Sequence, residues 1–165
     1  MILGCREIGL ELNAGKCELF VSGKVTDASE IHARFKTIAP EIKLMTSADL
    51  SPLGAPMFED GIISKVTEKQ SELITMIDKL QALPAHQALF LLKNCLAIPK
   101  LTYILRCSPT FKCHESLLSI DDTLRRGLEK VTNIKMDSLA WIQASLPVKH
   151  GGLGIRRTSS IALPA

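Results

Sequence analysis

A chain of 165 residues is long enough for one domain, or for one domain with a small appendage. Apolar residues make up 46% and charged residues 22%, a composition that excludes an intrinsically disordered chain. The net charge of +3 does not by itself indicate nucleic-acid binding, because that activity depends on basic residues that cluster on one surface.

The cysteine pattern favours a reduced, intracellular protein. The five cysteines are scattered and form no CxxC pair, which argues against a disulfide framework or a structural zinc site. Charged residues follow Met1 closely, so no signal peptide is predicted. The longest apolar region, residues 88–105, is interrupted by Lys93, Asn94, Pro99 and Lys100, and we therefore expect no membrane-spanning helix and no membrane partner.

Short β-like runs and turn residues dominate the chain up to residue 60. The runs "CELFVSG" (17–23) and "IKLMTS" (42–47) are rich in β-formers and predict two strands. Between them, Asp27 or Ser29 is predicted to cap a helix that runs through Ile31, Phe35 and Ile38 until Pro40 stops it.

The next stretch, "DLSPLGAPM" (49–57), packs two prolines and a glycine among apolar residues. It predicts a tight hairpin or an edge segment rather than a helix.

After residue 60 the apolar residues follow a helical period. A first helix is predicted from Ile62 to Leu83, with Pro84 ending it and an apolar face of Ile63, Val66, Leu73, Ile77 and Leu80. A second begins near Ala85, is apolar nearly all round, and is expected to be the buried one, with a kink or a division at Pro99. A third runs from His114 to about Val131, and a fourth begins at Asp137 as its N-cap.

These elements predict an α+β, mainly helical fold, with a small strand–helix–strand unit followed by a helical bundle. Three regions are expected: residues 1–60, residues 61–146, and a closing tail of residues 147–165 that is rich in glycine and arginine. We expect the closing tail to fray.

No pair of carboxylates makes a convincing metal site. Glu59 and Asp60 fit a solvated helix start, and Asp121 and Asp122 are neighbours on a helix, where side chains point about 100° apart. The spacing of Cys107, Cys113 and His114 closes no zinc tetrahedron. The remaining histidines, His32, His86 and His150, stand alone.

Basic residues gather in the closing tail around a flexible "GGLG". Backbone amides of glycines beside arginines could hold phosphates, although an ordinary loop explains the same residues about as well. The candidates for this site are Lys149, His150, Arg156 and Arg157.

Three segments resemble reverse transcriptases of the non-LTR retrotransposon type. "GLELNAGKCEL" (9–19) is similar to the palm segment that follows the catalytic aspartate pair. "SPLGAPM" (51–57) resembles the primer-grip element, and "LPVKHGGLGIRR" (146–157) resembles the segment that closes the helical region beyond the thumb. The three occur in the family's order and span nearly the whole chain.

The resemblance implies roles for particular residues. Lys16 matches a palm lysine near the incoming nucleotide, where an ammonium group would assist pyrophosphate departure. Leu53 and Gly54 match the primer-grip turn, where the backbone approaches the primer's phosphates. A structural role is implied first for the glycines of the last segment, Gly151, Gly152 and Gly154.

The family's metal ligands lie ahead of the first matched segment, and the eight residues "MILGCREI" that precede Gly9 contain no aspartate. The resemblance therefore implies a truncated palm with a helical thumb and connection, inactive alone. Mg²⁺ is implied only for the intact RNA-directed DNA polymerase. The expected partners are primer–template nucleic acid, bound weakly, and the missing palm and fingers. A helical protein-interaction domain, or a non-functional gene remnant, stays open as the alternative.

Overall fold

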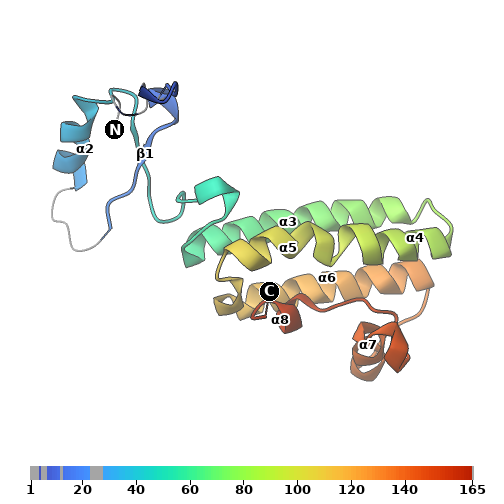
Figure 1. Ribbon diagram of the computed structural model, residues 1–165. Helices are drawn as coiled ribbons and strands as arrows, with labels where there is room; N and C mark the ends of the chain where they lie inside the picture. The colour runs from blue at the N-terminus through green and yellow to red at the C-terminus, as the bar shows by residue number, and fades with distance from the viewer. Residues whose placement is uncertain (1–3, 5–6, 12, 23–27, 165) are drawn as a thin grey trace. The chain divides into compact units, whose positions relative to one another are not determined.

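The computed structural model describes all residues except 1–3, 5–6, 12, 23–27 and 165 (Figure 1). The chain divides into two compact units, Met1–Leu50 and Ser51–Ala165, so the division falls ahead of the predicted boundary at residue 60. Helices predominate, and the described residues also form a small parallel sheet of two strands. The predicted α+β, mainly helical fold class is confirmed.

The first unit contains a strand–helix–strand arrangement, as the sequence predicts. Glu18 pairs with Lys43 and Leu19 with Leu44 in a parallel register, so the connection between the strands crosses over through a helix. The imidazole Nε2 of His32 lies 2.9 Å from the carbonyl oxygen of Ile42, a hydrogen bond that ties this helix to the second strand. The elements are η1 (Ala14–Lys16), β1 (Glu18–Leu19), α2 (Ala28–Lys36) and β2 (Lys43–Leu44).

The ends of α2 differ from the prediction. One of the two proposed caps, Asp27, lies outside the described residues, and the other, Ser29, lies inside the first turn. The helix ends at Lys36, before Pro40 is reached, because the backbone N–H groups of Ile38 and Ala39 both donate to the carbonyl of Phe35.

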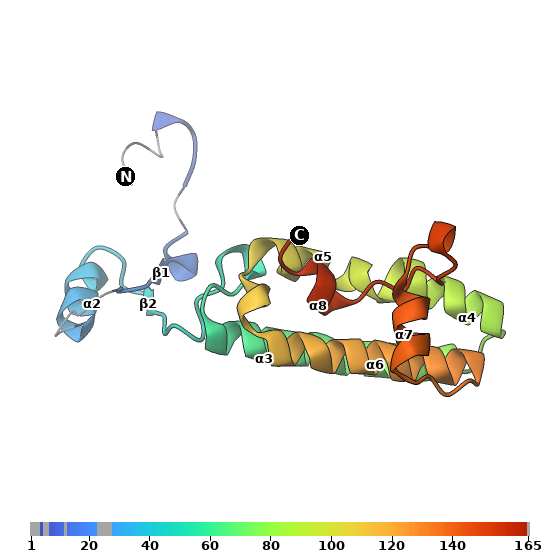
Figure 2. The ribbon, with the colours of Figure 1, turned by 90° about the horizontal axis from the view of Figure 1, so that it is seen from below.

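The second unit is a bundle of three long helical rods. Two of them, α3 and α6, lie side by side, and the third rod is composed of α4, a π-helical turn and α5 (Figures 1 and 2). The elements are η2 (Pro52–Gly54), α3 (Glu59–Leu80), α4 (Ala85–Leu91), η3 (Leu92–Leu96), α5 (Ile98–Cys107), η4 (Thr110–Lys112), α6 (His114–Thr132), α7 (Ser138–Ser145), η5 (Val148–His150) and α8 (Thr158–Ile161).

The core of the bundle comes from one apolar stripe on each rod. Side chains three or four positions apart share a face of an α-helix, and this spacing recurs on α3 and α6. The buried positions of these two helices include Ile62, Val66, Leu73, Ile77, Leu80, Leu117, Ile120, Leu124, Leu128 and Val131. The helix predicted from His114 to about Val131 is thereby confirmed.

Two predictions about the core are wrong in detail. Ile62, 1% exposed, occupies the buried face of α3, whereas Ile63 is 40% exposed, because only Ile62 is in helical phase with Val66 and Leu73. The second helix is not buried all round: Leu92 is fully buried and Phe90 is 62% exposed, because its other side is not covered by α3 and α6.

The connections show one confirmed prediction and two wrong ones. Asp137 caps α7, and its Oδ1 accepts a hydrogen bond from the backbone N–H of Ala140 at 2.8 Å. The segment around Leu53 forms a 3₁₀ turn rather than a hairpin or an edge segment, since residues 45–58 contain no strand. Residues 147–162 of the closing tail are packed rather than frayed, because Ile155 and Thr158 are both fully buried.

One helical stretch among the described residues, Ala85–Cys107, is long and apolar enough to cross a membrane by length and composition. It is the α4–η3–α5 rod, which places Ala88, Leu92, Leu101 and Ile104 in the core of the bundle. The expectation that the chain has no membrane partner stays a prediction.

Candidate nucleic-acid interface

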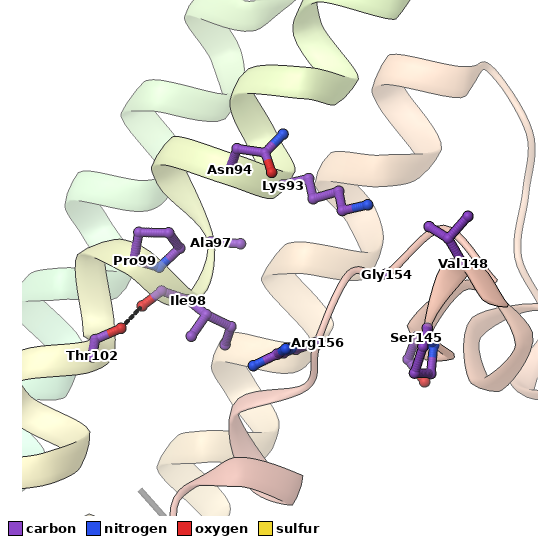
Figure 3. Close-up of a pocket in the computed structure, with 11 residues that line it drawn as sticks. Lys93, Asn94, Ala97, Ile98, Pro99, Thr102, Ser145, Val148, Gly154 and Arg156 are labelled. Atoms are coloured by element: carbon purple, nitrogen blue, oxygen red, sulfur yellow. Dashed lines mark hydrogen bonds between the residues drawn. The ribbon is translucent and has the colours of Figure 1, made fainter. Parts of the chain in front are cut away.

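Two cavities meet along α5. The larger, about 500 Å³, lies between the η3–α5 junction and the chain from the end of α7 to Arg156 (Figure 3). The smaller, about 250 Å³, lies between α5 and α8. Ile98, Thr102 and Arg156 line both, so we treat them as one groove and call it the α5 groove.

The α5 groove is basic. Lys93 of η3, Arg106 of α5 and Arg156 of the closing tail line it, and none of its described lining residues is an aspartate or glutamate. Figure 3 shows Lys93 and Arg156 reaching from opposite walls into the space between η3–α5 and the closing tail. Among the described residues, none of the three cations forms an ion pair. Their N–H donors are therefore available to an anionic ligand.

The other polar side chains of the larger cavity are already engaged within their own helices. Thr102 Oγ1 donates to the carbonyl of Ile98 at 2.9 Å, which Figure 3 marks, and Asn94 Nδ2 donates to the carbonyl of Phe90 at 2.9 Å. Ser145 Oγ likewise donates to a backbone carbonyl of α7 at 2.7 Å. Charge attraction from Lys93 and Arg156 is thus the main force that this cavity offers a ligand.

The π turn of η3 sets the position of Lys93. Pro99 has no N–H to donate to the carbonyl four residues earlier, and the chain widens just before it: the N–H of Ala97 bonds to the carbonyl of Leu92 at 2.9 Å. The predicted division of this helix at Pro99 is confirmed, with α5 beginning at Ile98. Such π turns are common at functional sites.

The glycines of the closing tail fasten one end of it to α7. The backbone N–H of Gly152 bonds to the carbonyl of Pro147, and that of Gly154 to Leu146. The N–H of Gly151 bonds within η5, to Val148. These amides are consequently engaged within the chain, and the phosphate-holding role considered for them lacks free donors.

Gly154 also makes room for Lys93. Its φ of +74° lies in the left-handed region, and a Cβ added there would meet Lys93 Nζ at 2.9 Å and Cε at 3.0 Å. The lysine side chain therefore reaches across the groove to the closing tail, into space that a side chain on residue 154 would occupy.

A buried carboxylate fastens the other end of the closing tail. Asp121 is 4% exposed, and its Oδ1 accepts from Thr158 N and Thr158 Oγ1, both at 2.6 Å. Its Oδ2 accepts from Ser159 Oγ at 2.5 Å and from Ser159 N at 3.2 Å. Since Arg156 lies only two residues before Thr158, this contact fixes the arginine at the groove.

The structure places only one of the predicted nucleic-acid residues in the groove, Arg156. Lys149 is exposed on η5, and Arg157 is half-buried just before α8; neither lines either cavity. Lys16 is exposed on η1 in the first unit. The sequence did not identify the other two cations of the groove. Lys93 was noted only as an interruption of the apolar region 88–105, and Arg106 was not singled out.

Leu53 and Gly54 form an exposed turn that is attached to α5. Both have positive φ, 52° and 80°, and the Leu53 side chain is 95% exposed. The hydroxyl of Tyr103, on α5, donates to the carbonyl oxygen of Leu53 at 2.5 Å. The turn is therefore held on the same helix that borders the groove.

The carboxylates and cysteines do not converge. Asp121 points inward to the closing tail, whereas Asp122 forms surface ion pairs with Arg125 and Arg126 at 2.7 and 2.8 Å. Cys107 is exposed and Cys113 is buried; burial, and then the charge of Glu59, raises the pKa of the Cys113 thiol, which opposes a role as nucleophile. Within the described part of the chain, no group of three or more His, Cys, Asp or Glu side chains could hold a metal ion.

Comparison with protein-family models, with curated proteins and with solved structures finds no match to this chain. The groove contributes three cations without ion-pair partners in the described residues, set on walls that the π turn, Gly154 and Asp121 hold in place.

Proposed function

We propose that this chain is the nucleic-acid-binding part of a reverse-transcriptase-like polymerase of the non-LTR retrotransposon type. In this proposal the first unit is palm-derived and the bundle is the thumb and connection. The observation that carries it is the α5 groove, which Lys93, Arg106 and Arg156 line without an acidic residue from the described part of the chain. The phosphates of a primer–template duplex are the ligand that this arrangement suits.

The turn at Leu53 supports the same proposal. Its exposed backbone has the positive φ values that glycine allows, and Tyr103 holds it on α5. A backbone segment that approaches primer phosphates must be exposed and fixed in this way. Catalysis is not proposed for the described residues. The matched segments follow the family's metal-binding aspartates, and no described carboxylate cluster fits Mg²⁺, so Lys16 is proposed only as an accessory to a metal site formed by other residues.

The proposal predicts how strongly the affinity for a duplex falls as the salt concentration rises. A protein that neutralises three phosphates of a duplex releases their counterions, which gives a slope of about −2.7 in log affinity against log salt concentration. Between 50 and 200 mM salt, the affinity for an RNA–DNA duplex would then fall about 40-fold.

The test is fluorescence anisotropy with a labelled RNA–DNA duplex at low salt. Lys93→Glu and Arg156→Glu should each lower the affinity about tenfold or more, because a negative charge would face the phosphates. The matched control is Lys135→Glu, which makes the same change of net charge on an exposed lysine outside the groove. An equal loss in all three variants would mean that net charge, not the groove, binds the duplex; absence of duplex binding at low salt would remove the proposal.

A second candidate, a helical protein-interaction domain, is favoured by one surface. Near α7 the apolar side chains of Ile134, Leu139, Ile142 and Val148 are 60%, 77%, 45% and 64% exposed. Exposed apolar groups of this kind mark interaction surfaces when they are contiguous. If Leu139→Asp abolished self-association in light scattering while no variant bound a duplex, this second function would replace the first.

A further inference from the structure

The contact between α6 and α8 has a feature that nucleic-acid binding does not explain. A buried carboxylate accepts from two consecutive hydroxyl side chains, Thr158 and Ser159, and two arginines directly precede this pair. We propose that Ser159 is a phosphorylation site, and that its phosphorylation releases the closing tail from Asp121.

The sequence before Ser159 fits a serine/threonine kinase that selects basic residues. Arg156 and Arg157 stand three and two positions ahead of the hydroxyl, and kinases discriminate substrates by such charge patterns. Residues 153–157 form neither helix nor strand, and Arg157 has an extended backbone, with φ −85° and ψ 135°. An acidic kinase subsite can pair with a guanidinium group presented in this way.

The transfer itself is ordinary phosphoryl chemistry with ATP as co-substrate. The bond between the γ-phosphorus and the bridging oxygen of ADP breaks, and a bond between that phosphorus and Ser159 Oγ forms. The hydroxyl proton passes to the catalytic base of the kinase, and ADP leaves.

Access requires that α8 open, because Ser159 Oγ donates to Asp121 in the closed arrangement. Helix α8 has four residues, far too few to be stable outside its packing, so its opening is local and does not require the bundle to unfold. Phosphorylation of the open form then removes it from the equilibrium with the closed form.

The phosphorylated side chain cannot return to the closed position. It carries a charge between −1 and −2 and would lie against Asp121, which is 4% exposed and forms no ion pair among the described residues. Like charges at hydrogen-bond distance in a buried site repel strongly. Arg156 and Arg157 stand three and two positions before Ser159 and can pair with the released phosphate, so a groove cation is withdrawn as well; this last effect rests on the proposed function.

The neighbouring Ser160 provides a matched control. It is exposed, adjacent in sequence and without a hydrogen bond to Asp121. A negative charge at Ser160 should therefore leave the closing tail in place, whereas the same charge at Ser159 should release it.

The test begins with the full chain, a basic-directed serine/threonine kinase and Mg·ATP, followed by peptide mapping. Phosphate on Ser159, lost in Ser159→Ala and retained in Ser160→Ala, supports the site; phosphate only on Thr158 or Ser160, or on no residue, overturns it. Release is measured by the rate of thermolysin cleavage before Ile155, which is fully buried in the closed arrangement, in the phosphorylated chain and in Ser159→Glu.

The phosphorylated chain and Ser159→Glu should each be cleaved about tenfold faster than Ser160→Glu. Equal cleavage rates would overturn the proposed release of the closing tail. Duplex affinity, measured in parallel on the unmodified chain, is a separate readout. If the unmodified chain binds no duplex, the proposed function fails; the mapping and cleavage results decide the phosphorylation site independently.

Discussion

Replacement of Asp121 tests the claim that one carboxylate holds the closing tail on the bundle. In Asp121→Ala, the buried N–H of Thr158 loses its acceptor, which costs about 1–3 kcal/mol. The Thr158 hydroxyl is partly spared, because it can donate to the carbonyl of Leu117, 3.0 Å away. Ser159 is half-buried, so its donors regain water, and their lost bonds to the carboxylate contribute about 1 kcal/mol more. We expect a total loss of about 3 kcal/mol in the free energy of unfolding.

The adjacent Asp122 is the control. Its carboxylate forms solvent-accessible, half-exposed ion pairs with Arg125 and Arg126, so Asp122→Ala should cost about 1 kcal/mol or less. Urea unfolding followed by the fluorescence of Trp141, the chain's single tryptophan, reports on the bundle in both variants. If Asp121→Ala lost less than about 1 kcal/mol, or no more than Asp122→Ala, the closing tail would be held by its apolar contacts alone.

Three further predictions concern close packing and thiol reactivity. Gly127→Ala should destabilise the bundle by about 1–2 kcal/mol despite its better helix propensity, because the added Cβ would meet Ile77 Cδ1 at 2.7 Å; Ile77→Val in the same chain should restore part of the loss in urea unfolding. Gly152→Ala should cost more than Gly127→Ala by the same assay, since its Cβ would lie 2.1 Å from the backbone carbonyl oxygen of the residue after α7, which cannot move aside as a side chain does. Burial raises the pKa of the Cys113 thiol, so peptide mapping after iodoacetamide treatment should find Cys113 alkylated more slowly than the exposed Cys107, and equal rates would contradict the buried position.

The regular elements could be predicted because their causes are local. The Asp137 cap, the bounds of α6 and the strand–helix–strand order all follow from residues within a few positions of each other. The candidate site could not be found in this way. A π turn adds a residue to one turn and shifts the phase of the following helix, so a period of 3.6 carried through Pro99 does not show that Lys93 faces Arg156.

Asp121 is a different case, because the sequence held a usable indication. It lies four residues after Leu117 and three before Leu124, both of which are buried, so it occupies the apolar stripe of α6 rather than the solvated face. A carboxylate in such a stripe must find hydrogen-bond donors from elsewhere in the chain. The two hydroxyl residues after Arg157 supply them, which is why a tail expected to fray is packed down to Ala162.

The two fastenings of the closing tail explain how a short, glycine-rich segment can form one wall of a binding groove. Engaged glycine amides hold it near α7, and Asp121 holds it near α8, so the stretch that carries Arg156 is fixed at both ends. A wall fixed before the ligand arrives loses less conformational entropy on binding than a free tail would. The groove is therefore sensitive to any change that releases one end of this segment. At the end near α8, a single carboxylate, Asp121, makes the contact, so one negative charge added beside it would suffice for release.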